Sequence, residues 1–106
     1  NSIIENTAKE LNIPYVKGNT LCTDCFDYYV KDVNELIKRF PKDLNIIGAE
    51  MEAFALFYNA HYLGKKASCL LSVVDSHYKH EEISAEERQT SLNSMITLAL
   101  ESACRI

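Results

Sequence analysis

The chain has 106 residues, 47% of them hydrophobic, and its 11 Lys and Arg against 15 Asp and Glu give a net charge of −4. This length suits one packed domain, and the absence of a basic stripe argues against nucleic-acid binding through phosphate neutralisation. No apolar run approaches the roughly 20 residues of a membrane span and the amino-terminal residues lack signal-peptide features, so we expect a cytoplasmic protein that binds no membrane.

Hydrophobic periodicity predicts helices and strands in alternation along the chain. A capping box formed by Ser84 and Glu87 marks the start of the last helix. The predicted elements are a helix at 2–11, a strand at 13–21, a helix at 30–40, a strand at 44–49, a helix at 50–63, a strand at 66–75 and a helix from 84 onward. This order predicts an α/β fold with a mostly parallel or mixed sheet flanked by helices.

The most informative stretch is the apolar run from Ala67 to Val74, which carries no charge and predicts a strand covered on both faces. Asp75 follows it directly, at the edge where α/β sheets bind ligands. The apolar neighbours Val73 and Val74 would disfavour the charged carboxylate, which would make Asp75 a proton donor near neutral pH. Arg88, thirteen residues later, offers a positive partner. Many such pairs are purely structural.

Glu50 and Glu52 flank Met51 where a predicted strand passes into a helix. Ionised carboxylates at a helix amino terminus can accept hydrogen bonds from a sugar diol, although acidic residues also occupy first turns for stability alone. An aromatic cluster of Phe26, Tyr28 and Tyr29 could cover a planar ligand, or could belong to a core or an interface.

Two further groups favour the simpler interpretation. Cys22 and Cys25 form a CTDC motif without a second CxxC, so small residues at a strand end are preferred over a redox or metal pair. The four cysteines are expected to be reduced thiols. His77 and His80 fit a solvated loop better than a metal site.

Three separated motifs resemble one family. GAEMEAFAL (48–56), VVDSH (73–77) and AEERQTSLNSMITLALESA (85–103) are similar to the carboxy-terminal part of the DeoD-like bacterial purine nucleoside phosphorylases, and GNTLCTDCF (18–26) resembles the preceding strand and turn of that family. The resemblance implies that residues 1–106 form the carboxy-terminal part of a single nucleoside phosphorylase domain. The fold would then be an incomplete half of a three-layer architecture, with the amino-terminal half absent.

The resemblance implies a reaction and a set of roles. The family converts a purine nucleoside and orthophosphate into free base and (deoxy)ribose 1-phosphate, with no cofactor, and the intact enzymes are homo-oligomers, typically hexamers. Asp75 would protonate N7 of the leaving purine and Arg88 would close on it. The other implied substrate contacts are Phe26 on the base, Glu50, Met51 and Glu52 at the ribose, with Glu52 on the sugar hydroxyls, and Val74 beside the acid.

This sequence departs from the family at several points. Val74 stands where serine is usual, Ser76 where histidine is common, and Asp27 where tyrosine is frequent. The GDP-type phosphate loop and the arginines of the amino-terminal half have no counterpart here, which predicts that the 106 residues alone do not catalyse phosphorolysis. A related hydrolytic purine nucleosidase and a non-catalytic assembly module remain alternatives.

Overall fold

The computed structural model describes residues 1–26, 29–76 and 81–106, and the chain divides into two compact units. The terminal unit comprises Asn1–Tyr15 and Cys69–Ile106, and the central unit comprises Val16–Ser68. Helices and a parallel strand pair confirm the predicted α/β class. Among the residues described, no helix combines the length and apolar character needed to cross a membrane.

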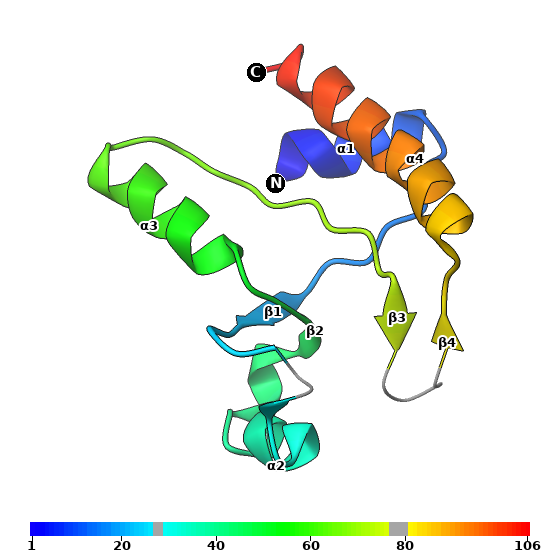
Figure 1. Cartoon of the computed structure of the whole chain (residues 1–106). Helices are drawn as coiled ribbons and strands as arrows, with labels where there is room; N and C mark the ends of the chain where they lie inside the picture. The colour runs from blue at the N-terminus through cyan, green and yellow to red at the C-terminus, as the bar shows by residue number, and fades with distance from the viewer. Residues whose placement is uncertain (27–28, 77–80) are drawn as a thin grey trace. The chain divides into compact units, whose positions relative to one another are not determined.

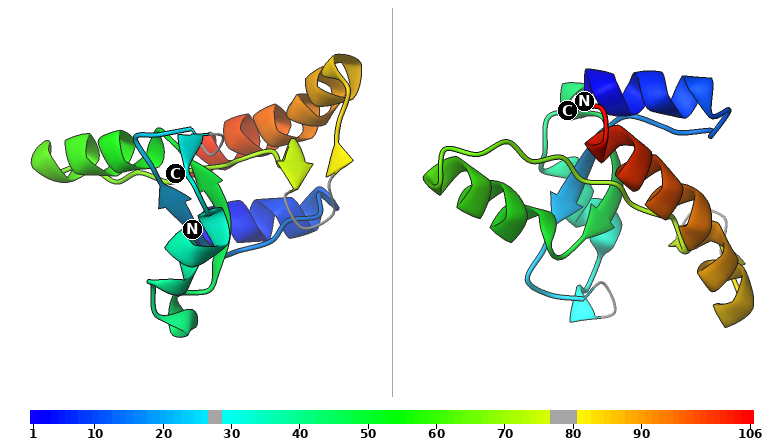
Figure 2. Two further views of the ribbon diagram at one scale, coloured as in Figure 1. Left: turned by 60° about the horizontal axis from the view of Figure 1, so that its bottom comes forward. Right: turned by 90° about the horizontal axis from the view of Figure 1, so that it is seen from above.

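Two helices form the body of the terminal unit. Helix α1 (Ser2–Glu10) lies beside α4 (Ala85–Ala103), as Figures 1 and 2 show. The buried side chains of this unit lie on these helices: Thr7, Ala8, Leu98 and Ser102. Arg105 Nη1 donates to Glu10 Oε2 at 2.5 Å and adds a charged link beyond the end of α4.

The start of α4 is the predicted capping box. The Ser84 hydroxyl accepts the Glu87 N–H at 3.1 Å, and Glu87 Oε2 accepts the Ser84 N–H at 2.8 Å. Two of the N–H groups that a helix leaves without intrahelical partners are thereby satisfied. The helix start is therefore set by local sequence, as expected.

The predicted central strand at 66–75 is wrong in this chain. Residues 65–74 form neither helix nor strand, and only β3 (Asp75–Ser76) forms a ladder, antiparallel to β4 (Glu81–Glu82). The Ile83 N–H continues this hairpin by donating to Val74 O at 3.1 Å. An apolar run becomes a sheet strand only beside another strand, and Val73 is 81% exposed here.

The central unit contains the predicted parallel pair, β1 (Asn19–Cys22) and β2 (Ile46–Glu50). Asn19 pairs with Ile46 but Thr20 pairs with Gly48, so Ile47 is an extra residue on β2 and forms a bulge. Gly18 makes room for this bulge, because a Cβ there would lie 2.5 Å from Ile47 Cδ1.

The helices of the central unit are shorter than predicted. Helix α2 (Val33–Lys38) begins after Asp32, whose Oδ1 accepts the Glu35 N–H at 3.1 Å, and a 3-10 turn, η2 (Lys42–Leu44), precedes β2. Helix α3 (Ala53–Tyr62) begins after β2, because Glu50 still belongs to the strand. Of α3 only Ala53 is buried. Its exposed large apolar side chains are Phe54, Leu56, Phe57, Tyr58 and Tyr62.

Candidate functional site

Glu50 is the last residue of β2, and its side chain turns toward the start of α3. Glu50 Oε2 accepts the Glu52 N–H at 2.8 Å and the Ala53 N–H at 2.6 Å. Both donors belong to the first turn of α3, where backbone N–H groups have no partner within the helix. The carboxylate therefore fixes the corner through which β2 passes into α3.

Two side chains of β1 complete this arrangement. The Thr20 hydroxyl donates to Glu50 Oε1 at 3.2 Å, and the Cys22 side chain helps to lower the pKa of Glu50. The Cys22 sulfur in turn accepts the Phe54 N–H at 3.4 Å. We call Thr20, Cys22 and Glu50 the clasp, since together they join β1, β2 and the first turn of α3.

The clasp holds Glu50 in its ionised form. Partial burial raises the pKa of Glu50, but the N–H groups of Ala53 and Glu52 and the side chains of Thr20 and Cys22 lower it, and the net pKa falls below the ordinary value of 4.5. Hydrogen bonds donated to a carboxylate favour its charged form. Near neutral pH the clasp therefore contains a fixed negative charge at the amino terminus of α3, where the helix dipole also favours one.

The bulge at Ile47 decides which β1 side chains meet Glu50. Beyond the bulge Cys22 pairs with Glu50, and Thr20 shares the face of Cys22 because side chains alternate along a strand. Without the extra residue Cys22 would pair with Ala49, and Glu50 would share a face with Leu21 instead. A single inserted residue thus assembles the clasp.

Glu52 and Met51 are placed differently from Glu50. Glu52 is exposed, and its Oε2 accepts the Met51 N–H at 3.2 Å. A carboxylate offers about four acceptor positions, so this single bond leaves Glu52 able to accept from a ligand. Met51 is 43% exposed at the same corner. Phe26, also in the central unit, is 53% exposed, and its carbonyl accepts the Tyr29 N–H at 2.9 Å.

Asp75, in β3, and Arg88, in α4, belong to the terminal unit. Strand β4 and the capping box lie between them in the chain, and Figure 1 shows β3, β4 and α4. Asp75 is exposed and Val74 is half-buried, so the residues that the structure describes do not form the expected apolar surroundings of the acid. Arg88 is exposed, and its backbone N–H donates to Ser84 O at 2.9 Å in the first turn of α4.

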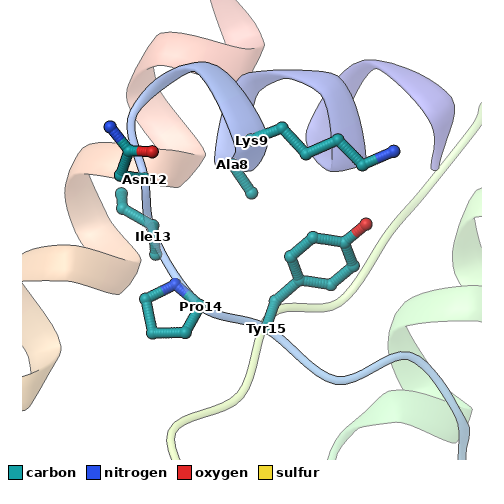
Figure 3. A pocket seen from close by; sticks show the side chains of 6 residues that line it. All are labelled: Ala8, Lys9, Asn12, Ile13, Pro14 and Tyr15. Carbon is teal, nitrogen blue, oxygen red and sulfur yellow. The ribbon is translucent and has the colours of Figure 1, made fainter.

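The terminal unit also contains a hollow that none of these residues lines. It is open and lies against the end of α1, where the Ala8 side chain faces the Tyr15 ring (Figure 3). Its lining is Ala8, Lys9, Asn12, Ile13, Pro14 and Tyr15, which includes no predicted site residue. In the parts of the chain that the structure describes, no cluster of three His, Cys, Asp or Glu side chains is arranged to hold a metal. Asp27, Tyr28, His77 and His80 lie outside the described residues.

The sequence profile of the Phosphorylase superfamily matches residues 1–106, the whole chain. The chain belongs to the Phosphorylase superfamily. Among curated relatives, the DeoD-type purine nucleoside phosphorylase of Dichelobacter nodosus is 40% identical over 99 residues, and that of Mycoplasma genitalium is 41% identical over 99 residues. The Mycoplasma pneumoniae protein of the same name is 35% identical over 104 residues.

These alignments cover 93% of this superfamily member in the first two cases and 98% in the third, but only 40% to 42% of each relative. The chain therefore spans about two-fifths of the length of the curated relatives it matches. The motif resemblance to the DeoD-type enzymes is confirmed by these matches.

Sequence reasoning about this superfamily member missed the roles of Thr20 and Cys22. Cys22 was expected to be only a small residue at the end of a strand, yet its sulfur accepts an α3 N–H. The available signal was the spacing of two hydrogen-bonding side chains at alternate positions of a predicted strand. The bulge that turns both toward Glu50 has no comparable signal in the sequence.

Proposed function

We propose that this chain forms part of a purine nucleoside phosphorylase of the DeoD type, which cleaves purine (deoxy)nucleosides with orthophosphate to give the free base and (deoxy)ribose 1-phosphate. The observation that carries the proposal is the 40% identity over 99 residues to a protein of that name. The exposed Glu52 carboxylate at the end of a parallel strand supports it, since ligands bind at that edge of α/β sheets.

Asp75 is the proposed general acid. As the bond between C1′ and N9 of the purine breaks, its electron pair moves onto the base, and a proton from Asp75 to N7 neutralises the developing charge. Orthophosphate forms the new bond to C1′. Arg88 stabilises the carboxylate that the transfer leaves behind. A carboxyl group that can be neutral or ionised suits both 6-amino and 6-oxo purines.

The central unit supplies the proposed substrate contacts. Glu52 accepts hydrogen bonds from the sugar hydroxyls, as an ionised carboxylate can. Met51 contacts the ribose, and the exposed ring of Phe26 packs on the base. Val74 lies next to the acid in the chain. The proposed partners are a purine nucleoside, orthophosphate and further copies of the same subunit, in the cytoplasm, without a cofactor.

Phosphate-dependent base release tests the proposal in two proteins. One is the 106-residue chain, for which we expect no turnover of inosine or adenosine. The other is the Dichelobacter nodosus enzyme with its matching 99-residue segment replaced by that of this chain, which we call the exchanged enzyme. We expect it to release base only with phosphate. Equal release without phosphate would support a hydrolytic nucleosidase, and no release by a folded exchanged enzyme would contradict the proposal.

A further inference from the structure

The two carboxylates of the Glu50–Met51–Glu52 segment are not equivalent. Both oxygens of Glu50 are engaged inside the protein, with two backbone N–H groups on Oε2 and the Thr20 hydroxyl on Oε1. Glu52 is exposed and accepts from Met51 N–H with one oxygen. A sugar diol needs a carboxylate with free acceptor positions, which Glu52 has and Glu50 largely lacks.

We propose that Glu50 is a positioning residue, and that the clasp holds Met51 and Glu52 in the conformation in which Glu52 alone of the two carboxylates meets the sugar hydroxyls. This deepens the proposed function and rests on it. Glu50 was expected to touch the ribose because it shares a motif with Glu52. The geometry instead indicates that Glu50 acts on the ribose indirectly, through the backbone of the residues that follow it.

Glu50 would lose hydrogen bonds within the protein by binding a ligand. To reach a sugar hydroxyl, the carboxylate would have to give up bonds to Glu52 N–H, Ala53 N–H and Thr20. Hydrogen bonds to charged groups are stronger than those between neutral groups. An N–H group at a helix start that loses its acceptor destabilises the fold when it is shielded from water. Ala53, whose N–H would lose its acceptor, is only 5% exposed.

The arrangement also explains why Cys22 belongs to the same unit. With Glu50 on the N–H groups of Glu52 and Ala53, the next donor in the chain is Phe54 N–H, and the Cys22 sulfur accepts it. Three successive N–H groups at the start of α3 therefore have side-chain acceptors from β1 and β2. The Glu52 side chain is attached within this fixed turn, so its direction is set by groups that touch no substrate.

The first test needs no activity and uses the 106-residue chain with ¹⁵N labelling. The amide signals of Glu52 and Ala53 are expected downfield in the native chain, and both should follow the titration of one carboxyl group. Glu50→Ala should abolish the downfield shift and speed exchange of the Ala53 amide at least tenfold. Glu50→Gln, which keeps an acceptor oxygen, should retain most of the shift. Unchanged Glu52 and Ala53 amides in Glu50→Ala would overturn the clasp.

The second test measures inosine KM and kcat in the exchanged enzyme. Glu52→Ala and Glu50→Ala are each expected to raise KM about tenfold to a hundredfold, as for lost hydrogen bonds to a charged group. The double variant should be no more than about twofold worse than Glu52→Ala, since Glu50 acts through Glu52. Glu50→Gln should have a KM for inosine within about threefold of that of the unsubstituted exchanged enzyme. If the increases in KM of the two single variants multiply in the double variant, the inference is contradicted and direct contact between Glu50 and the sugar is favoured.

A nucleoside without the 2′ and 3′ hydroxyls separates positioning from a general structural defect. With 2′,3′-dideoxyinosine, Glu50→Ala and Glu52→Ala should both lose their effect on KM. A Glu50→Ala penalty that persists with this substrate would overturn the link to the sugar. If the proposed function is wrong, the exchanged enzyme will show no phosphorolysis, and the role of Glu52 at the ribose falls with it. The amide measurements on the 106-residue chain still decide whether the clasp exists.

Discussion

The central and terminal units present their candidate residues in opposite ways. In the central unit, four hydrogen bonds between Thr20 and Phe54 fix the turn that carries Glu52. In the terminal unit, a two-residue strand pair and a helix cap are the only regular features between Asp75 and Arg88 among the described residues, and both side chains are exposed.

This difference indicates how the two halves of the proposed chemistry depend on their surroundings. A sugar-binding carboxylate must accept hydrogen bonds in a fixed direction, and the clasp supplies that direction within the chain. A proton donor needs a dry environment to stay protonated near neutral pH. The Asp75 side chain is exposed, so the described residues of this chain do not supply such an environment. That the 106 residues alone are inactive stays a prediction.

The largest expected effect concerns the acid. In the exchanged enzyme, Asp75→Ala should lower kcat for inosine by about 10² to 10⁴, the range for loss of a general acid. Asp43→Ala, in the exposed η2 turn, is the matched control and should leave kcat within about twofold. Turnover of inosine and adenosine that is unaffected by Asp75→Ala would remove the terminal unit from the chemistry.

The next effect tests the bulge in the central unit. Gly18→Ala should destabilise the chain by about 1–2 kcal/mol in urea unfolding, because the new Cβ would lie 2.5 Å from Ile47 Cδ1 and the side chain must shift. Gly48→Ala is the control on the paired strand, where the nearest atom, Thr20 Cγ2, is 3.9 Å away. Equal costs for the two variants would show that Ile47 moves aside freely.

A cap substitution tests the terminal unit at the corresponding level. Ser84→Ala should cost about 1 kcal/mol, since it leaves the Glu87 N–H without its side-chain acceptor. Hydrogen exchange at the start of α4 should accelerate while the Glu52 and Ala53 amides of the central unit stay unchanged. Simultaneous acceleration at both places would mean that the two units open together.

Acid should weaken both units through one carboxylate each. Hydrogen bonds from the backbone N–H and hydroxyl of Ser84 hold the pKa of Glu87 below 4.5, and the pKa of Glu50 is lowered as well. For both groups the unfolded chain binds protons more readily, so their stabilisation is complete above about pH 4.5 and is lost as the pH falls through the lower native value. Glu50→Gln and Glu87→Gln should each remove the pH dependence of protection, the exchange rate relative to that of the unfolded chain, in one unit only. Persistence in the double variant would assign it to other groups.

The smallest effect is expected at a buried hydroxyl. Ser102 is 4% exposed, and its Oγ has no hydrogen-bond partner among the described residues. Ser102→Ala removes a shielded polar group and should be neutral or stabilising by up to about 1 kcal/mol in urea unfolding. Thr7→Ala, whose hydroxyl donates to Ile3 O at 2.8 Å, is the buried comparison and should destabilise.

Local signals in the sequence predicted the parts of the fold that local forces set. The cap formed by Ser84 and Glu87 follows from two residues three positions apart. The strand expected at 67–74 depended on neighbouring strands that the sequence pattern cannot supply, and the segment forms neither helix nor strand. Glu50 and Glu52 were identified as a pair, but their separate tasks depend on Thr20 and Cys22 of another strand and on the Ile47 bulge.

The bulge at Ile47 also limits where the chain can change in length. An insertion or deletion before Gly18 leaves the pairing of Thr20 with Gly48 and of Cys22 with Glu50 intact. One residue added or removed between Ile47 and Glu50 would exchange the two sides of β2 and point the carboxylate away from its partners. Descendants of this sequence should therefore tolerate variable loops ahead of β1 while keeping the spacing from Ile47 to Glu50 constant.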